Sequence, residues 1–202
     1  MQITLTDTGK RFNREWIFRH CSYEFAAAKK YAITGPNGSG KSTLLQVIAG
    51  SLSFNEGTVT FKNMSVIPAE EHYQHVSIAA PYLELIEEMT ALELLSFHTK
   101  FKPLSIPATE ALQITGLENA ANKEIRYYSS GMKQRLKLAQ AFFSNTPVLL
   151  LDEPTTNLDE EGIKLYQYLI NNHTANRLVI ISSNDLHEYN FCENVLRISD
   201  YK

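Results

Sequence analysis

A glycine-rich stretch between a predicted strand and a predicted helix constrains the fold of this chain more than any other feature. It contains a glycine, four residues, a second glycine, a lysine and a serine in that order. The apolar run Tyr31–Thr34 precedes it, and Lys41–Ala49 has a pattern typical of a helix. This order predicts a phosphate-binding loop at the edge of a sheet. The loop consists of Gly35, Pro36, Asn37, Gly38, Ser39, Gly40, Lys41, Ser42 and Thr43.

The residue types in this loop suit the binding of phosphate groups. Glycines let backbone amides point inward at phosphate oxygens, and the following helix adds the positive end of its dipole. Lys41 can reach the β- and γ-phosphates of a nucleotide, and the hydroxyl of Ser42 can coordinate Mg²⁺. The alternative is a flexible surface loop. From average residue frequencies, roughly one chain in a hundred of this length would contain the pattern by chance. The predicted strand before the loop and the predicted helix after it make a chance match rarer still.

Two carboxylates follow a second apolar strand. Val148–Leu151 is apolar throughout, and Asp152 and Glu153 come directly after it. In open α/β sheets, ligands bind at the carboxyl ends of the strands. We therefore expect Asp152 to hold Mg²⁺ directly or through a water, and Glu153 to act as the general base for the water that attacks a γ-phosphate. The alternative is an ordinary turn before Pro154, and the presence of a phosphate loop in the same chain argues against it.

A second helix begins with small polar residues. Ser129, Ser130 and Gly131 open the predicted helix Gly131–Ser144. Serine oxygens accept hydrogen bonds from the free amides of a first helical turn, and such helix starts also bind anions. Taken alone, this stretch is an ordinary helix cap.

The order of the predicted elements indicates an α/β fold with an inserted helical part. Runs without polar alternation are typical of parallel strands that are buried on both faces. A capping box at Thr90–Glu93, and Pro107 and Gly116 at the two ends of a further helix, indicate helices within Tyr82–Tyr128. We predict one domain over residues 1–202, with a core of about 1–81 and 129–202 and a helical subdomain of about 82–128. Strands are expected at Gln2–Leu5, Ile17–Phe18 onward, Tyr31–Thr34, Thr58–Phe61, His75–Ala79, Val148–Leu151, Leu178–Ser182 and Val195–Ile198.

The three motifs, in this order and at this spacing, resemble those of the ATP-binding subunit of an ABC transporter, and the resemblance covers nearly the whole chain. Gly35–Thr43 resembles the Walker A loop and Leu149–Glu153 the Walker B strand. Tyr128–Met132 resembles the family signature Leu-Ser-Gly-Gly-Gln, and Thr156–Asp159 resembles the D loop. Phe12 stands where the family has an aromatic ring that stacks on adenine, although a core aromatic residue is the alternative there.

This resemblance implies a P-loop NTPase core with a mainly parallel sheet, an N-terminal antiparallel β part and an inserted helical subdomain. It also implies that two subunits pair head to tail, as a homodimer or a heterodimer. ATP and Mg²⁺ would lie between one subunit's phosphate loop and the other's signature, with Ser129, Ser130 and Gly131 among the contacts. ATP would close the pair, hydrolysis would open it, and an integral membrane transporter subunit would convert this cycle into transport.

Two departures from the family pattern concern its signature and its glutamine. Ser130 replaces a glycine and Met132 a glutamine, so Ser130 adds a side chain close to the expected position of the partner's γ-phosphate. The family also has a glutamine that touches the Mg²⁺ site after the strand expected at His75–Ala79. No glutamine follows that strand here, and Pro81 or Tyr82 falls nearest.

The third departure lies in the stretch Val179–Asp185, which resembles the strand that ends in the family's switch histidine. Asn184 stands at the place of that histidine, and we do not expect His187 to replace it. Asparagine can still donate a hydrogen bond but cannot carry charge. Removing one preorganised donor to a developing charge costs on the order of 10²–10³ in rate. With Lys41, Glu153 and Asn184 as the expected catalytic residues, we predict that ATP binding survives and that hydrolysis is slow.

Composition restricts the partners and the location. The formal net charge is −3, whereas nucleic-acid-binding surfaces are usually basic, so we expect no nucleic-acid partner. No apolar run approaches the length of a membrane span, and residues 1–12 lack the apolar centre of a signal peptide. Cys21 and Cys192 lack a metal-ligand spacing, which favours free thiols in a reducing compartment. We expect a cytoplasmic protein that reaches the inner face of the membrane through its partner.

Two functions stay open at this level. The first is an ATPase subunit that energises a membrane transporter. The second is an ATP-dependent regulatory or binding subunit with weak or no hydrolysis in an asymmetric complex. Translation and DNA-repair relatives of the fold usually carry two such domains or long coiled coils, which are missing here. The stretch Met89–His98 and the compact size resemble the small subunit that powers haem export in cytochrome c maturation.

Overall fold

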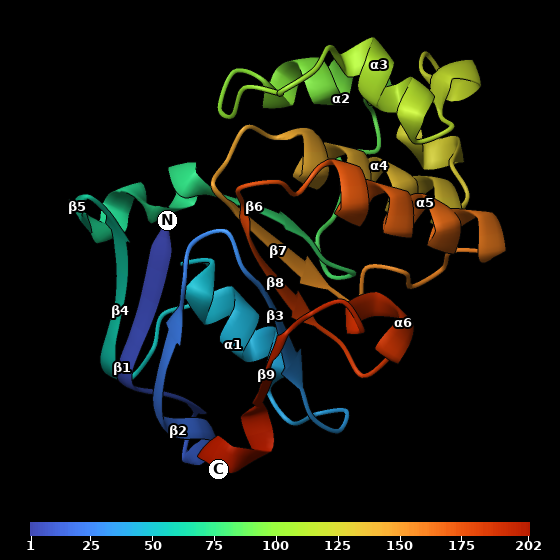
Figure 1. Cartoon of the computed structure of the whole chain (residues 1–202). Helices are drawn as coiled ribbons and strands as arrows, with labels where there is room; N and C mark the ends of the chain where they lie inside the picture. Colours follow the sequence, from blue (N-terminus) through green and yellow to red (C-terminus); the bar gives the residue numbers. More distant parts are fainter.

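A parallel sheet of five strands forms the centre of the computed structural model, which describes residues 1–202 (Figure 1). Its strand order is β6-β7-β8-β3-β9, and every neighbouring pair is parallel. The carboxyl ends of these strands therefore meet at one edge, as Asp152 beside Ser182 and Ser182 beside Ile33 illustrate. The strands are β3 (Lys30–Thr34), β6 (Val76–Ala79), β7 (Val148–Asp152), β8 (Leu178–Ser182) and β9 (Asn194–Arg197).

A second sheet of four antiparallel strands lies beside the first and contains the N-terminal strand (Figure 1). Its order is β2-β1-β4-β5. The strands are β1 (Gln2–Phe12), β2 (Glu15–Phe25), β4 (Glu56–Asn63) and β5 (Ser65–Ile67). The predicted fold class, a P-loop core with a parallel sheet and an N-terminal antiparallel β part, is confirmed.

Helices follow most of the strands of the parallel sheet. They are α1 (Lys41–Ile48), α2 (Ala91–His98), α3 (Ala108–Ile114), α4 (Ser130–Phe143), α5 (Glu160–Asn172) and α6 (Leu186–Tyr189). Short 3₁₀ helices are η1 (Ala69–His75), η2 (Glu118–Ala120), η3 (Ile125–Tyr127) and η4 (Ile198–Tyr201). None of the helices combines the length and the apolar character that crossing a bilayer requires.

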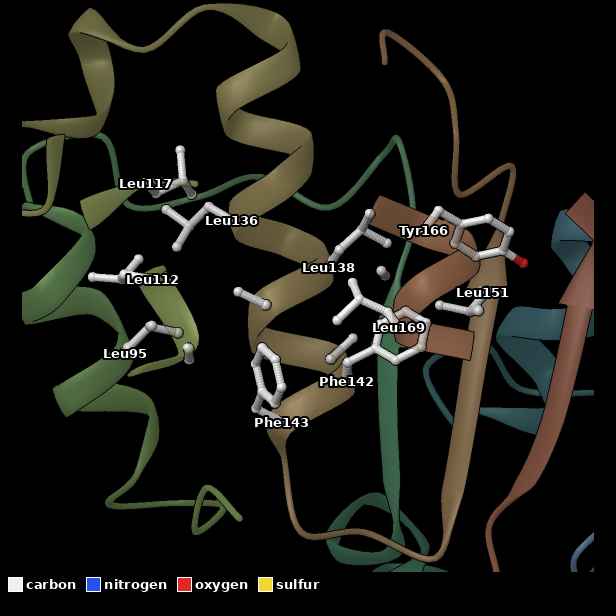
Figure 2. Packing of buried hydrophobic residues seen from close by; sticks show 14 of the residues in the cluster. Leu95, Leu112, Leu117, Leu136, Leu138, Phe142, Phe143, Leu151, Tyr166 and Leu169 are labelled. Carbon is white, nitrogen blue, oxygen red and sulfur yellow. The ribbon is translucent and has the colours of Figure 1, made fainter. Parts of the chain in front are cut away.

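The two faces of the parallel sheet contact different layers, because successive side chains of a strand point to opposite faces. Val148 and Leu150 of β7 belong to a cluster with α1 and the antiparallel sheet. Leu149 and Leu151 belong to a second cluster with α4 and α5. Figure 2 shows α4 between this face and the helices α2 and α3, with buried side chains on both of its sides.

Most predicted elements agree with the structure to within one or two residues, and the differences have local causes. The predicted capping box before α2 is present, since Thr90 and Glu93 each accept the other's backbone amide. β1 is longer than predicted because irregular pairing around Leu5, Thr8 and Lys10 disrupts the apolar alternation, and β2 begins two residues before the predicted start at Ile17. His75 lies in η1 and not in β6. Strand β5 was not predicted. The division into a core and a helical subdomain stays a prediction.

Candidate nucleotide site

The phosphate loop connects β3 to α1 and carries glycines with left-handed backbone conformations. Gly40 precedes α1 with φ of 104°, and no side chain caps the first turn of that helix. The amides of this turn are therefore free for a ligand. A Cβ atom at position 40 would come within 2.5 Å of Ile17 Cγ2, so both φ and space require glycine.

A hollow of about 210 Å³ lies over the loop. Residues Asn37–Thr43 line it together with Ile17 and Glu153. The structure therefore brings the predicted general base to the predicted phosphate loop. Phe12 is not among the lining residues. Phe12 is 47 % exposed, and the ammonium of Lys10 lies 5.0 Å from the centroid of its ring. The predicted stacking of Phe12 on adenine stays a prediction, and Ile17 is a lining residue that sequence reasoning missed.

Lys41 is almost fully buried at the base of this loop. Its ammonium donates to the carbonyl oxygen of Gly35 at 2.8 Å. A lysine held inside a ring of backbone groups presents a positive charge where phosphate oxygens are expected.

Asp152 ends β7 and lies buried at the carboxyl edge of the sheet. Burial raises the pKa of Asp152, while the hydroxyls of Ser182 and Ser42 and the charge of Lys41 lower it. One of its carboxylate oxygens, Oδ1, is buried without a hydrogen-bond partner. Burial of such an oxygen costs free energy unless a cation or a hydrogen-bond donor binds to it.

The unpartnered carboxylate oxygen of Asp152 and the hydroxyl of Ser42 are hard oxygen donors, the type that Mg²⁺ prefers. These two residues therefore fit the predicted Mg²⁺ position. No group of three or more His, Cys, Asp and Glu side chains is arranged to hold a metal ion.

Glu153 has a backbone conformation that is rare for a residue with a side chain. Its φ is 41°, and its amide donates to the carbonyl of Ser182 at 2.9 Å. Left-handed conformations of this kind cost on the order of 1 kcal/mol and are frequent at functional sites. Glu153 also lines a second hollow, together with Thr155, Thr156, Ser183, Asn184, Asp185 and Glu188.

Asn184 lies against the phosphate loop. Its Oδ1 accepts the backbone amide of Gly35 at 3.2 Å, and its Nδ2 donates to Oδ1 of Asn37 at 3.2 Å. The side chain thus has protein partners on both ends of its amide group. A contact between Asn184 and a γ-phosphate stays a prediction. His187 is exposed on α6.

Two further polar residues of this region are Tyr82, which lies near Asp152, and Gln46, which lies near Tyr82. Burial raises the pKa of Tyr82, the Asp152 charge raises it further, and a hydrogen bond with Gln46 lowers it. The phenol of Tyr82 therefore lies in the region where the family glutamine was expected. Gln46 was missed, although its position four residues after Ser42 places the two on one face of α1.

The signature residues line a different hollow, of about 370 Å³. Ser129 caps α4, and its oxygen accepts the amide of Met132 at 3.2 Å. Arg135 of α4 forms an ion pair with Asp159 at 3.1 Å, which ties the signature helix to the start of α5. This hollow shares no lining residue with the one over the phosphate loop. It is lined by Gly116, Leu117, Ser129, Ser130, Gly131, Met132, Arg135, Asn157 and Asp159.

Comparison with known proteins agrees with this arrangement of motifs. The profile of the family described as ABC transporter matches residues 18–156, which include the phosphate loop, the signature and the Asp152–Glu153 pair. The chain belongs to the ABC transporter family. Within it, the protein is an ATP-binding subunit, and the resemblance inferred from the sequence is confirmed.

Individual relatives cover most of this ABC protein. The cytochrome c biogenesis ATP-binding export protein CcmA of Rhizobium etli is 31 % identical over 189 residues, 91 % of this chain and 87 % of the relative. The uncharacterized ABC transporter ATP-binding protein YybJ of Bacillus subtilis is 29 % identical over 184 residues, 90 % and 84 % of the two chains. A solved ATP-binding cassette dimer, in a post-hydrolysis state with ADP and Pi, is 25 % identical with a TM-score of 0.82, covering 96 % of this chain and 93 % of that one.

Proposed function

We propose that this protein binds and hydrolyses ATP with Mg²⁺ and that closure of a dimer around the nucleotide drives an ABC membrane transporter. The observation that carries this proposal is the convergence of Lys41, Asp152 and Glu153 at the carboxyl edge of one sheet. A buried carboxylate oxygen without a partner, beside a loop of free amides, supports a site for a phosphate–metal complex.

Each residue has a role that follows from its chemistry. The amides at the start of α1 and the ammonium of Lys41 bind and orient the phosphates. Ser42 and Asp152 would hold Mg²⁺, which when bound neutralises phosphate charge. Glu153 can accept a proton from a water positioned at the γ-phosphate.

The protein partners of this chain are proposed from what the similar proteins are named for. The solved dimer with ADP and Pi supports pairing with a second ATP-binding subunit. The CcmA relatives carry the words "export protein" in their names, which supports an exporter as the membrane partner. Because such a partner lies in a membrane, we propose a cytoplasmic protein bound peripherally at its inner face. The similarity to CcmA proteins agrees with the resemblance of Met89–His98 noted from the sequence.

The experiment compares ATP hydrolysis and nucleotide binding of the wild type with two variants. Glu153→Gln keeps the shape of the side chain but cannot act as a base, so we expect retained nucleotide binding and a rate lower by about 10²–10⁴. Lys41→Ala removes a charge-assisted contact and should weaken binding about 10- to 100-fold. Glu161→Gln, an exposed carboxylate in the first turn of α5, is the matched control. A wild type that binds no nucleotide would contradict the proposal.

A regulatory or binding subunit with weak hydrolysis is the second candidate. The two hydrogen bonds between the Asn184 carboxamide and the phosphate loop favour this candidate, because they leave only one N–H of the Nδ2 group to donate to a phosphate. The Glu153→Gln variant separates the two candidates in cells. Loss of transport in that variant would mean that transport requires ATP hydrolysis, whereas full transport would support the regulatory role.

A further inference from the structure

Asn184 reaches the phosphate loop because two parallel strands end side by side. Ser182 of β8 pairs with Ile33 of β3, and the amide of Ser183 donates to the carbonyl of Ile33 at 3.2 Å. Both strands end at this level, so the segment after β8 runs beside the segment after β3. Asn184 therefore meets Gly35 across 149 residues of sequence.

The hydrogen bonds fix how the carboxamide of Asn184 is oriented. The backbone amide of Gly35 can only donate, so the atom that faces it at 3.2 Å must be the acceptor Oδ1. The Nδ2 group then faces Oδ1 of Asn37, at 3.2 Å. These two hydrogen bonds, which we call the Asn184 bridge, span the first three residues of the loop.

The peptide groups at Gly35 are held from two directions. Its amide donates to Asn184, while its carbonyl oxygen accepts from the ammonium of Lys41 at 2.8 Å. The position is also crowded, because a Cβ atom there would lie 2.8 Å from Ser39 Oγ and from Ile198 Cγ2. The start of the loop therefore has a defined conformation in which the side chain of Asn184 takes part.

We propose that Asn184 is a positioning residue that holds the phosphate loop in its nucleotide-binding conformation through the Asn184 bridge. This inference rests on the proposed function, since it concerns nucleotide affinity. A carboxamide suits the role because it accepts and donates through adjacent atoms and carries no charge that would repel phosphate. An imidazole has its two nitrogens on different sides of a ring, and a carboxylate has no donor and is anionic.

The Asn184 bridge predicts a different effect on nucleotide affinity from the one expected if Asn184 contacted the γ-phosphate. The loop cradles the phosphates that ADP and ATP share, so loss of the bridge weakens both nucleotides to a similar extent. A residue that contacts the γ-phosphate affects ATP and leaves ADP unchanged. We expect Asn184→Ala to weaken Mg·ADP and a non-hydrolysable Mg·ATP analogue alike, by about 3- to 10-fold, since each hydrogen bond contributes modestly in contact with water. Titration calorimetry measures both affinities.

Three further variants make the test specific. Asn190→Ala changes an exposed asparagine at the end of α6 and should leave both affinities unchanged. Asn37→Ala removes the second partner of the bridge, so the double variant Asn37→Ala/Asn184→Ala should lose less than the product of the two single effects. If Asn184 contributed only to the overall stability of the fold, the two substitutions would show no such coupling.

Hydrogen exchange provides a readout that needs no nucleotide. In the free protein, the backbone amides of Gly35 and Asn37 should exchange faster in Asn184→Ala than in the wild type and in Asn190→Ala. Unchanged amide exchange in Asn184→Ala would overturn the proposed role of the Asn184 bridge. A loss of affinity for the ATP analogue alone, or tighter binding of either nucleotide, would overturn it too. Faster exchange in a protein that binds no nucleotide would contradict the proposed function and leave the bridge itself supported.

Discussion

Glu188 is a buried carboxylate that joins α6 to the segment after the Asp152–Glu153 pair. Its Oε1 accepts the backbone amide of Thr155 at 2.7 Å, and its Oε2 is buried without a partner. Burial raises the pKa of Glu188, the hydroxyls of Ser183 and Thr155 lower it, and the charge of Asp185 raises it again. The folded protein therefore holds a proton on this side chain more strongly than the unfolded chain does.

The raised pKa of Glu188 predicts how stability depends on pH. A carboxyl whose pKa is higher in the folded state stabilises the fold below the ordinary glutamate pKa of 4.5, and this contribution is lost as the pH rises through the folded pKa. Glu188→Gln cannot ionise and keeps an oxygen for the amide of Thr155. In urea denaturation, we expect the wild type to lose stability relative to Glu188→Gln as the pH rises above 4.5.

Glu193→Gln is the control for this pH series, because Glu193 is exposed and lies only five residues after Glu188 in the chain. Its difference in unfolding free energy from the wild type should not vary with pH over the same range. A Glu188→Gln difference that is equally independent of pH would contradict the assignment of the raised pKa.

At the scale of elements, Arg177 ties a helix end to the parallel sheet. It lies just before β8, and its guanidinium donates to the carbonyl of Phe142 at 2.7 Å, near the end of α4. The same group donates to Ser77 Oγ of β6 at 2.7 Å and to Thr146 Oγ1 at 3.1 Å. Burial lowers the pKa of Arg177 to about 10. Its planar fork therefore stabilises three segments together.

Replacement of Arg177 should destabilise the fold. Arg177→Met keeps an apolar stem but leaves buried acceptors without donors, so we expect a loss of about 2–4 kcal/mol in the free energy of unfolding. Arg177→Lys keeps the charge but loses the fork geometry, so its loss should be smaller. Urea denaturation measures both. Arg197→Met, at an exposed arginine of β9, should change stability by less than about 0.5 kcal/mol. An Arg177→Met variant as stable as that control would contradict this role.

Local patterns were sufficient for the elements around the phosphate loop. β7 and β8 were predicted because their runs are apolar throughout, and α1 because a glycine-rich turn precedes it. β1 was predicted too short because its irregular pairing with β2 hides the alternation. The partners of Asn184 and Tyr82 could not be predicted, since both depend on which strands end side by side, and that is a property of the sheet.

At the scale of the whole molecule, one chain presents the phosphate loop and the signature in two separate hollows. The hollow over the phosphate loop and the hollow at the signature have no lining residue in common. If a second subunit completes the site, the signature of one chain lies over the nucleotide of the other. Ser130, the exposed first residue of α4, would then stand next to the partner's phosphates.

A glycine at position 130 should strengthen nucleotide-driven dimerisation. Ser130 adds a side chain where the family has none, and a smaller residue lets the two surfaces approach more closely. In the Glu153→Gln background, which keeps ATP bound, we expect Mg·ATP to produce a dimer and Ser130→Gly to tighten it several-fold. Sedimentation at a series of protein concentrations measures this change. Ser199→Gly, at an exposed serine of η4, should have no effect. A weaker dimer with Ser130→Gly would instead mean that the Ser130 hydroxyl binds the partner's nucleotide.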